Sequence, residues 1–231
     1  LNAIHDKEKT IQQWNPAMIP FDLYPLGTTT AVNDLAAMNG FAKTVDVAYK
    51  FSAGRPLWMV IQTFGSRMGA RVPIPAEIRT MAYLSVAHGA KGIFYFLYNS
   101  DSQLEKLSGL DQNKDQFTEV AKLSLELKKL APVILKLTRT DNIAALTLGK
   151  GDIQSFVDDK KIKYLVLVNA DAATAQELKF AVTLDPAAKT KISKSIDLKT
   201  NKPLAKPQLT PELATFSITL PPGDGTILRV E

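Results

Sequence analysis

The sequence contains no cysteine, and this absence excludes several kinds of site. Disulfide scaffolds, thiolate metal sites and cysteine nucleophiles all need a residue that the 231-residue chain lacks. It has two histidines, which leaves few nitrogen ligands for a transition metal, although a calcium ion held by carboxylates stays open. We therefore expect no cofactor.

Other familiar patterns are missing as well. No apolar run approaches the roughly 20 residues that cross a bilayer, so no membrane partner is expected. The sequence has no glycine-rich dinucleotide motif, no phosphate-binding P-loop and no Gly-x-Ser-x-Gly elbow. No charged segment followed by an apolar run opens it, and the compartment is left open, with a secreted or periplasmic location favoured.

The charge is mildly basic and evenly spread. There are 28 Lys and Arg against 23 Asp and Glu, a net charge of +5. Residues 1–130 contribute +2 of this balance and residues 131–231 contribute +3, so neither half carries a concentrated basic stripe. A nucleic-acid footprint needs such a stripe, and no nucleic-acid partner is expected.

The first part of the chain alternates between strand and helix patterns. Buried strands are expected around 18–25, 56–64 and 93–98, with helices over 35–51, 75–88 and 115–130; another helix is expected to end near Trp14. The order predicts a parallel sheet with helices outside, and the nearly continuous apolar run PLWMVIQTF at 56–64 is typical of a strand covered on both faces. Pro132 is expected to mark the approximate end of the last helix.

The second part consists of short segments rich in β-branched residues. They lie at 144–148, 153–157, 164–169, 178–183, 195–198, 216–220 and 227–230, with turn residues between them. This spacing predicts an antiparallel sandwich or small barrel. We place the boundary so that residues 1–137 form the α/β part and residues 138–231 the all-β part.

Several segments resemble the last three βα units of glycoside hydrolases with a (β/α)8 barrel. These are FDLYP at 21–25, RPLWMVIQTFG at 55–65 and PIPAEIRTMAYLSVAHGAKGIFYFLYN at 73–99. YLVLVNAD at 164–171, DLKTNKPL at 197–204 and LPPGDGTILRV at 220–230 are similar to the β-domain that often follows these barrels. The resemblance implies a partial TIM barrel, strands six to eight, followed by a β-sandwich; the alternative is an independent α/β domain.

The resemblance also implies partners. A complete barrel takes about 250 residues, so roughly five βα units would lie upstream. The expected partners are a carbohydrate substrate and either the upstream half of the barrel or a second copy joined through the open sheet edge.

In such barrels the site lies at the carboxyl ends of the strands. Asp22 is the candidate catalytic carboxylate there, with a structural role in the turn before Pro25 as the alternative. Glycosidic hydrolysis usually needs two carboxylates, so at least one is expected outside this chain.

The candidate substrate-binding residues surround this position. Gln62 stands at or near the place where the resemblance implies a nucleophilic glutamate, and an amide can only hydrogen-bond sugar hydroxyls. The other candidates are Tyr24, Phe64, Tyr98 and Asn99. Phe94 and Phe96 are expected in the core.

Three polar residues are interpreted as structural. Glu77 is expected to complement a helix dipole with Arg79 as its partner, and His88 to bond the carboxyl end of a helix.

The resemblance implies a glycoside hydrolase-like protein that hydrolyses a glycosidic bond and is catalytically incomplete on its own. The alternatives are a non-catalytic carbohydrate-binding or interaction module and a fragment without separate function.

Overall fold

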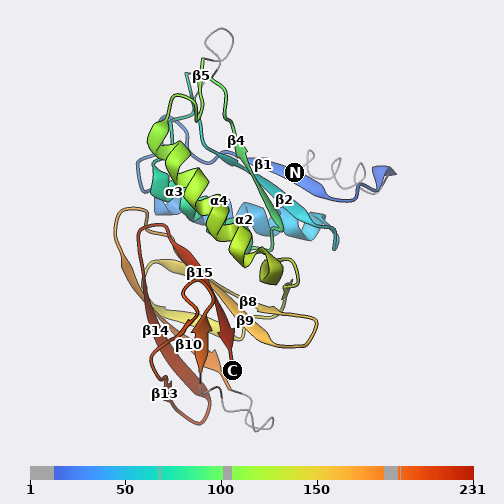
Figure 1. Cartoon of the computed structure of the whole chain (residues 1–231), viewed down its shortest axis with the longest axis vertical. Helices are drawn as coiled ribbons and strands as arrows, with labels where there is room; N and C mark the ends of the chain where they lie inside the picture. The colour runs from blue at the N-terminus through green and yellow to red at the C-terminus, as the bar shows by residue number, and fades with distance from the viewer. Residues whose placement is uncertain (1–12, 68, 101–105, 185–191, 193) are drawn as a thin grey trace.

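The computed structural model describes residues 13–67, 69–100, 106–184, 192 and 194–231. In Figure 1 the parallel sheet and its helices occupy the upper half, and the antiparallel β part occupies the lower half. The expected helix ending near Trp14 lies almost entirely outside the described residues.

The first part is a three-stranded parallel sheet with the order β1-β2-β4. Its strands are β1 (Ile19–Leu23), β2 (Leu57–Gln62) and β4 (Gly92–Phe96). The helices are α2 (Leu35–Phe51), α3 (Pro75–Ala87) and α4 (Lys114–Ile134). A two-stranded antiparallel pair, β3 (Gly65–Ser66) and β5 (Leu107–Ser108), extends from the end of the sheet (Figure 1).

The helix boundaries follow local chemistry. The side chain of Asp34 accepts the N–H groups of Ala36 and Ala37 at 2.9 and 3.0 Å, which caps α2. α4 runs two residues beyond Pro132, close to the approximate end expected there. Proline keeps a helical φ and costs one hydrogen bond, which the last turn tolerates.

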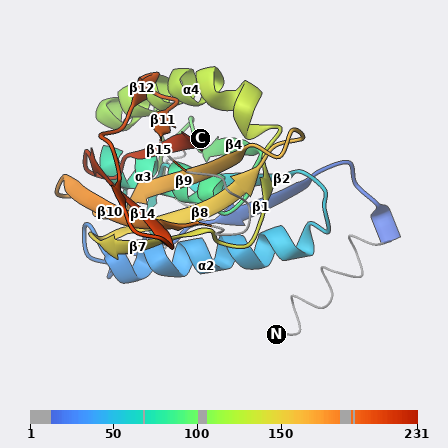
Figure 2. The ribbon, with the colours of Figure 1, turned by 90° about the horizontal axis from the view of Figure 1, so that it is seen from below.

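α3 is the centre of the molecule. Ten of its thirteen residues are buried, because it contacts α2, α4, β2 and the antiparallel part at once. Figure 2 shows α2 and α4 on opposite sides of it. A helix that is apolar on nearly every side is a core helix.

The parallel sheet is covered on one face among the described residues. Ile19, Met59 and Ile61 belong to the core on the helix side. On the opposite face Phe94 is 44% exposed and Phe96 is 38% exposed. The core packing predicted for these two phenylalanines is therefore wrong in this chain, because nothing described covers their side of the sheet.

The second part is a sandwich of two antiparallel sheets. One sheet has the order β12-β11-β15-β9-β8-β6 and the other β13-β14-β10-β7. The strands are β6 (Thr138–Arg139), β7 (Ala144–Leu148), β8 (Gly151–Val157), β9 (Lys163–Asn169), β10 (Gln176–Thr183), β11 (Ser195–Asp197), β12 (Lys202–Pro203), β13 (Gln208–Leu209), β14 (Leu213–Leu220) and β15 (Gly225–Val230). The predicted fold class, parallel βα units that do not close a barrel within the described residues followed by an antiparallel sandwich, is confirmed.

The two parts share a core. Along β9, Leu165 and Leu167 face the second sheet, whereas Val166 and Val168 belong to the core around α3. A strand buried on both faces explains the unbroken apolar run in its sequence. The domain boundary at 137 stays a prediction.

Candidate functional site

The parallel strands end at one edge, where the predicted site residues come together in part. Asp22 lies opposite Val60, which lies opposite Phe94, so these three side chains form one row across the open face. The next row contains Gln62 opposite Phe96. Parallel strands align their carboxyl ends, and the register therefore sets Asp22 one row below the end of the sheet.

Three aromatic rings form a cluster at this edge. Tyr24 lies 5.2 Å from Phe64 and 5.6 Å from Phe96 between ring centroids, and Phe64 lies 5.5 Å from Phe96. The first and third contacts are edge-to-face and the second is stacked, which are the favoured aromatic geometries. Phe64 is buried and Phe96 is exposed, so the cluster joins the core to the open face.

The carboxylate of Asp22 stands beside this cluster. The hydroxyl of Tyr24 donates to Asp22 Oδ2 at 3.2 Å, and Asp22 is exposed. Partial burial and the neighbouring carboxylate raise the pKa of Tyr24 to about 12. Tyr24 therefore stays a neutral hydrogen-bond donor at physiological pH, and Asp22 keeps free acceptor capacity toward the open face.

Gln62 has a different environment. It is fully buried, and its Oε1 accepts the N–H of Leu26 at 3.0 Å. Its Nε2 donates to the carbonyls of Leu26 and Arg71 at 3.0 and 2.9 Å, and to that of Phe64 at 3.2 Å. The amide thus ties together the loops that follow β1 and β2, and a sugar hydroxyl would have to displace a backbone partner to reach it.

Tyr98 and Asn99 lie farther along the chain, after β4. Tyr98 is 57% exposed and its ring contacts Phe117 of α4 at 6.0 Å between centroids. Asn99 is exposed as well. The structure thus brings Asp22, Tyr24, Phe64 and Gln62 close together, and it places Tyr98 and Asn99 on the adjoining segment that leads to β5.

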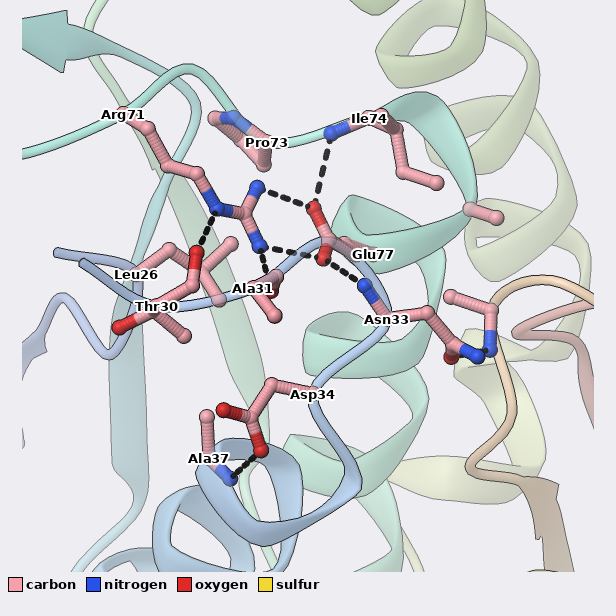
Figure 3. Close-up of polar contacts among 12 residues, drawn as sticks. Leu26, Thr30, Ala31, Asn33, Asp34, Ala37, Arg71, Pro73, Ile74 and Glu77 are labelled. Carbon is pink, nitrogen blue, oxygen red and sulfur yellow. Dashed lines mark hydrogen bonds and ion pairs between the residues drawn. The ribbon is translucent and has the colours of Figure 1, made fainter. Parts of the chain in front are cut away.

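A buried ion pair joins the loops that follow β1 and β2 (Figure 3). Glu77 is fully buried, and its carboxylate receives the Arg71 guanidinium through two hydrogen bonds of 2.8 and 2.6 Å. It also accepts the N–H groups of Asn33 and Ile74, each at 2.9 Å. Arg71 donates further to the carbonyls of Thr30 and Ala31.

The sequence reasoning missed this network. Arg79, the predicted partner of Glu77, instead bonds Glu119, Glu126 and Asp224 at 2.7 to 2.9 Å. Residues two apart on a helix do not face each other, so the spacing of Glu77 and Arg79 in the sequence already argued against this pair. Arg71 could be found only through the fold, because it lies in the loop before α3 and no helical spacing relates it to Glu77.

The loop that follows β1 is joined to the sandwich. The Asn33 amide donates to Asp171 at 2.9 Å and its oxygen accepts the N–H of Ala172 at 2.6 Å. His88, at the carboxyl end of α3, makes a second junction with the sandwich through Asp152 of β8 at 3.2 Å, and it also bonds Asp46 of α2 at 2.7 Å. The sandwich is thereby bonded near both ends of α3, the helix whose first residues bind the loops of the candidate site.

Within the described part of the chain, no group of three His, Cys, Asp or Glu side chains is arranged to hold a metal ion. Each helix described there is too short or too polar to cross a membrane.

Solved structures similar to this chain include glycoside hydrolases. A GH27 β-L-arabinopyranosidase from Geobacillus stearothermophilus has 11% identity and a TM-score of 0.43, over 97% of this chain and 60% of its own. The α-fucosidase from Thermotoga maritima has 10% identity and a TM-score of 0.45, over 100% of this chain and 56% of its own. An α-amylase from Malbranchea cinnamomea has 11% identity and a TM-score of 0.39, over 99% and 59%. This chain spans 60% or less of each of these three structures. No protein-family model matches the sequence, and no curated protein matches it.

Proposed function

We propose that this chain is the carboxyl-terminal part of a (β/α)8-barrel glycoside hydrolase-like protein that hydrolyses a glycosidic bond in a carbohydrate. One observation carries the proposal: a carboxylate, Asp22, stands beside an aromatic cluster at the carboxyl ends of three parallel strands. Catalytic sites of barrels with parallel strands lie at that end.

The chemistry of a sugar matches this arrangement. Sugar rings present apolar C–H faces that pack on aromatic rings, and their hydroxyls need fixed donors and acceptors. Phe96 and Tyr24 supply the apolar surface, while the Tyr24 hydroxyl and the Asp22 carboxylate supply the polar contacts. Tyr98 and Asn99 extend the same edge.

The open face supports the barrel interpretation. Trp58, Val60 and Phe94 point away from the helices, and the rings of Trp58 and Phe94 lie 5.1 Å apart. Parallel sheets are normally covered on both faces, and further strands that close a barrel would cover these side chains. Gln62 is assigned a positioning role, since its amide already binds the loops.

Asp22 is the proposed catalytic carboxylate, and its partner belongs to strands outside this chain. Glycosidases hold two such groups about 5–5.5 Å apart when they retain configuration and farther apart when they invert it. On the described strands of the open face Asp22 is the one carboxylate, so the second has to come from elsewhere.

The test is turnover of a panel of 4-nitrophenyl glycosides by the full-length protein. Asp22→Asn should lower kcat by at least about 100-fold with little change in KM, because a positioned acid or base contributes this much. Asp159→Asn, an exposed aspartate in the sandwich, is the matched control and should leave kcat unchanged. Equal loss in both variants, or none in Asp22→Asn, contradicts the catalytic role.

A non-catalytic carbohydrate-binding module is the second candidate. It is favoured by Gln62, an amide bound to backbone groups at the place where the resemblance implies a nucleophile. Glycoside binding without turnover in the full-length protein, weakened by Phe96→Ala, would select this alternative.

A further inference from the structure

We propose that the cavity next to the aromatic cluster binds an anionic substituent of the saccharide, a carboxylate or a sulfate ester. This inference rests on the proposed carbohydrate function and specifies its substrate class. The cavity has a volume of about 660 Å³, within the usual range for small-ligand sites.

The cavity is built by three loops at the carboxyl end of the sheet. Ser66 and Arg67 follow β2, Thr28 follows β1, and Lys106 and Ser108 lie in and beside β5. β3 continues directly from the segment that contains Phe64, and pairs with β5 through Gly65 opposite Ser108. The cavity therefore adjoins the aromatic cluster along the chain.

The loops are held in this shape by backbone contacts. The N–H of Thr28 donates to the carbonyl of Gly69 at 3.0 Å, and Gly27 forms a bridge with Ala70. A side chain at Gly65 would place its Cβ 2.7 Å from Val72 Cγ2 and 3.0 Å from the Val72 nitrogen, so the close approach of these segments requires glycine.

The charge of the lining selects an anion. Among the described residues that line the cavity, two are cationic, Arg67 and Lys106, and none is acidic. Within the described part of the chain neither cation has an ion-pair partner. Arg71, Arg79 and Arg139 contrast with them, because each is partly buried and bonded to a carboxylate.

The two cations suit a substituted sugar better than a free ion. A guanidinium binds a carboxylate or sulfate through two parallel hydrogen bonds, and a lysine adds a second positive charge. Thr28, Ser108 and Gln112 supply neutral hydrogen-bonding groups of the kind that sugar hydroxyls use. Lys106 has a φ of +47°, a conformation that non-glycine residues seldom adopt and that is concentrated at functional positions.

The experiment compares the affinity of the 231-residue chain for three ligands. Isothermal titration at low salt uses 4-nitrophenyl glucuronide, the 6-O-sulfated 4-nitrophenyl glucoside and the neutral 4-nitrophenyl glucoside, each as both anomers. The anionic glycosides should bind at least about tenfold more tightly than the neutral one. The tighter of the two anionic ligands then identifies the substituent.

The variants test the assigned residues. Arg67→Gln and Lys106→Gln should each weaken anionic binding about tenfold and leave neutral binding unchanged. Lys160→Gln, an exposed lysine in the sandwich, is the control and should change neither. Thermal unfolding of all three variants checks that they fold.

Two results overturn the inference in distinguishable ways. Equal binding of anionic and neutral glycosides, insensitive to Arg67→Gln and Lys106→Gln, removes the anion preference while carbohydrate binding stands. Failure of all three ligands to bind removes the inference, while the proposed function is decided separately by the turnover test with the full-length protein.

Discussion

Glu77 is a carboxylate with no contact with solvent, and its environment shows why it can be charged. Two guanidinium hydrogen bonds and two backbone N–H groups surround it. A buried ion of this kind stabilises only while its partners are complete, because removal of one leaves the other uncompensated. The pair therefore holds together the loops that follow β1 and β2 and carry the candidate site.

Glu77→Gln should lower the free energy of unfolding by about 3 kcal/mol, because it leaves the guanidinium of Arg71 without its counter-charge. Urea denaturation measures the change. Glu231→Gln removes the surface pair with Arg229, whose side chains are 41% and 37% exposed, and should cost less than about 1 kcal/mol. Similar losses in both variants would contradict the role of burial.

His88 gives stability a pH dependence. Burial opposes its charged form, but hydrogen bonds to Asp152 and Asp46 outweigh burial and raise its pKa to about 9. Since the folded pKa lies above the ordinary value of 6.5, the stabilisation is complete below pH 6.5 and is lost as the pH rises through 9. This shift corresponds to about 3 kcal/mol.

The unfolding free energy of the wild type, relative to His88→Gln, should fall by this amount between pH 6.5 and 9. The measured quantity is the difference between the two proteins, because Lys91 titrates in the same pH range and its effect cancels in the difference. Burial lowers the pKa of Lys91 to about 8, which gives stability the opposite slope above pH 8 in both proteins. A difference that does not vary with pH would show that His88 is neutral in the fold.

At the scale of elements, the parallel sheet has two unlike faces. Its helix side is closed, whereas Trp58, Phe94 and Phe96 form an apolar surface that the described residues leave open. Both outer strands, β1 and β4, also have one unpaired edge within the described part of the chain. Such surfaces favour association.

The isolated chain should self-associate through this face. Phe94→Ser should shift sedimentation equilibrium toward monomer, because it removes an aromatic ring from the centre of the surface. Leu125→Gln changes an apolar residue on α4 that is 64% exposed and serves as the control. A wild type that is monomeric at tens of micromolar, or an equal shift in both variants, would contradict the prediction.

Close contact between α3 and the sandwich depends on a glycine. Gly223 has a φ of +66°, and a Cβ there would lie 2.2 Å from the carbonyl oxygen of Ala76. Gly223→Ala should therefore lower the melting temperature by several degrees. Gly40 of α2 has open space around it, and Gly40→Ala should raise stability by about 0.5–1 kcal/mol. A stabilising Gly223→Ala together with a destabilising Gly40→Ala would contradict this packing.

The elements were predictable where the pattern is local. The helix over Leu35–Phe51 and seven of the ten described strands of the sandwich follow from the sequence pattern, and the structure confirms them. The two-residue strands β6, β12 and β13 were not predicted, because they are too short to leave a pattern. The exposure of Phe94 could not be predicted, because alternation tells which residues share a face and not whether another layer covers it. Gln62 shows the same limit for the site, since an amide that binds sugar and one that binds backbone look alike in sequence.

At the scale of the whole molecule, α3 joins the two parts into one core. The sandwich contacts it through β9 and β15, and α2 and α4 flank it. The candidate site thus rests on a closed, buried core, whereas its open face points away from everything described. This asymmetry is the reason we propose a barrel completed by strands outside the chain.

Hydrogen exchange tests this claim most directly. The backbone amides of β1 and β4 are followed by mass spectrometry in the isolated 231-residue chain and in the full-length protein. If further strands pair with both edges, these amides should exchange at least about tenfold more slowly in the full-length protein, while those of β9 stay unchanged. Equal exchange of β1 and β4 in the two proteins would contradict the barrel and, with it, the proposed position of the active site.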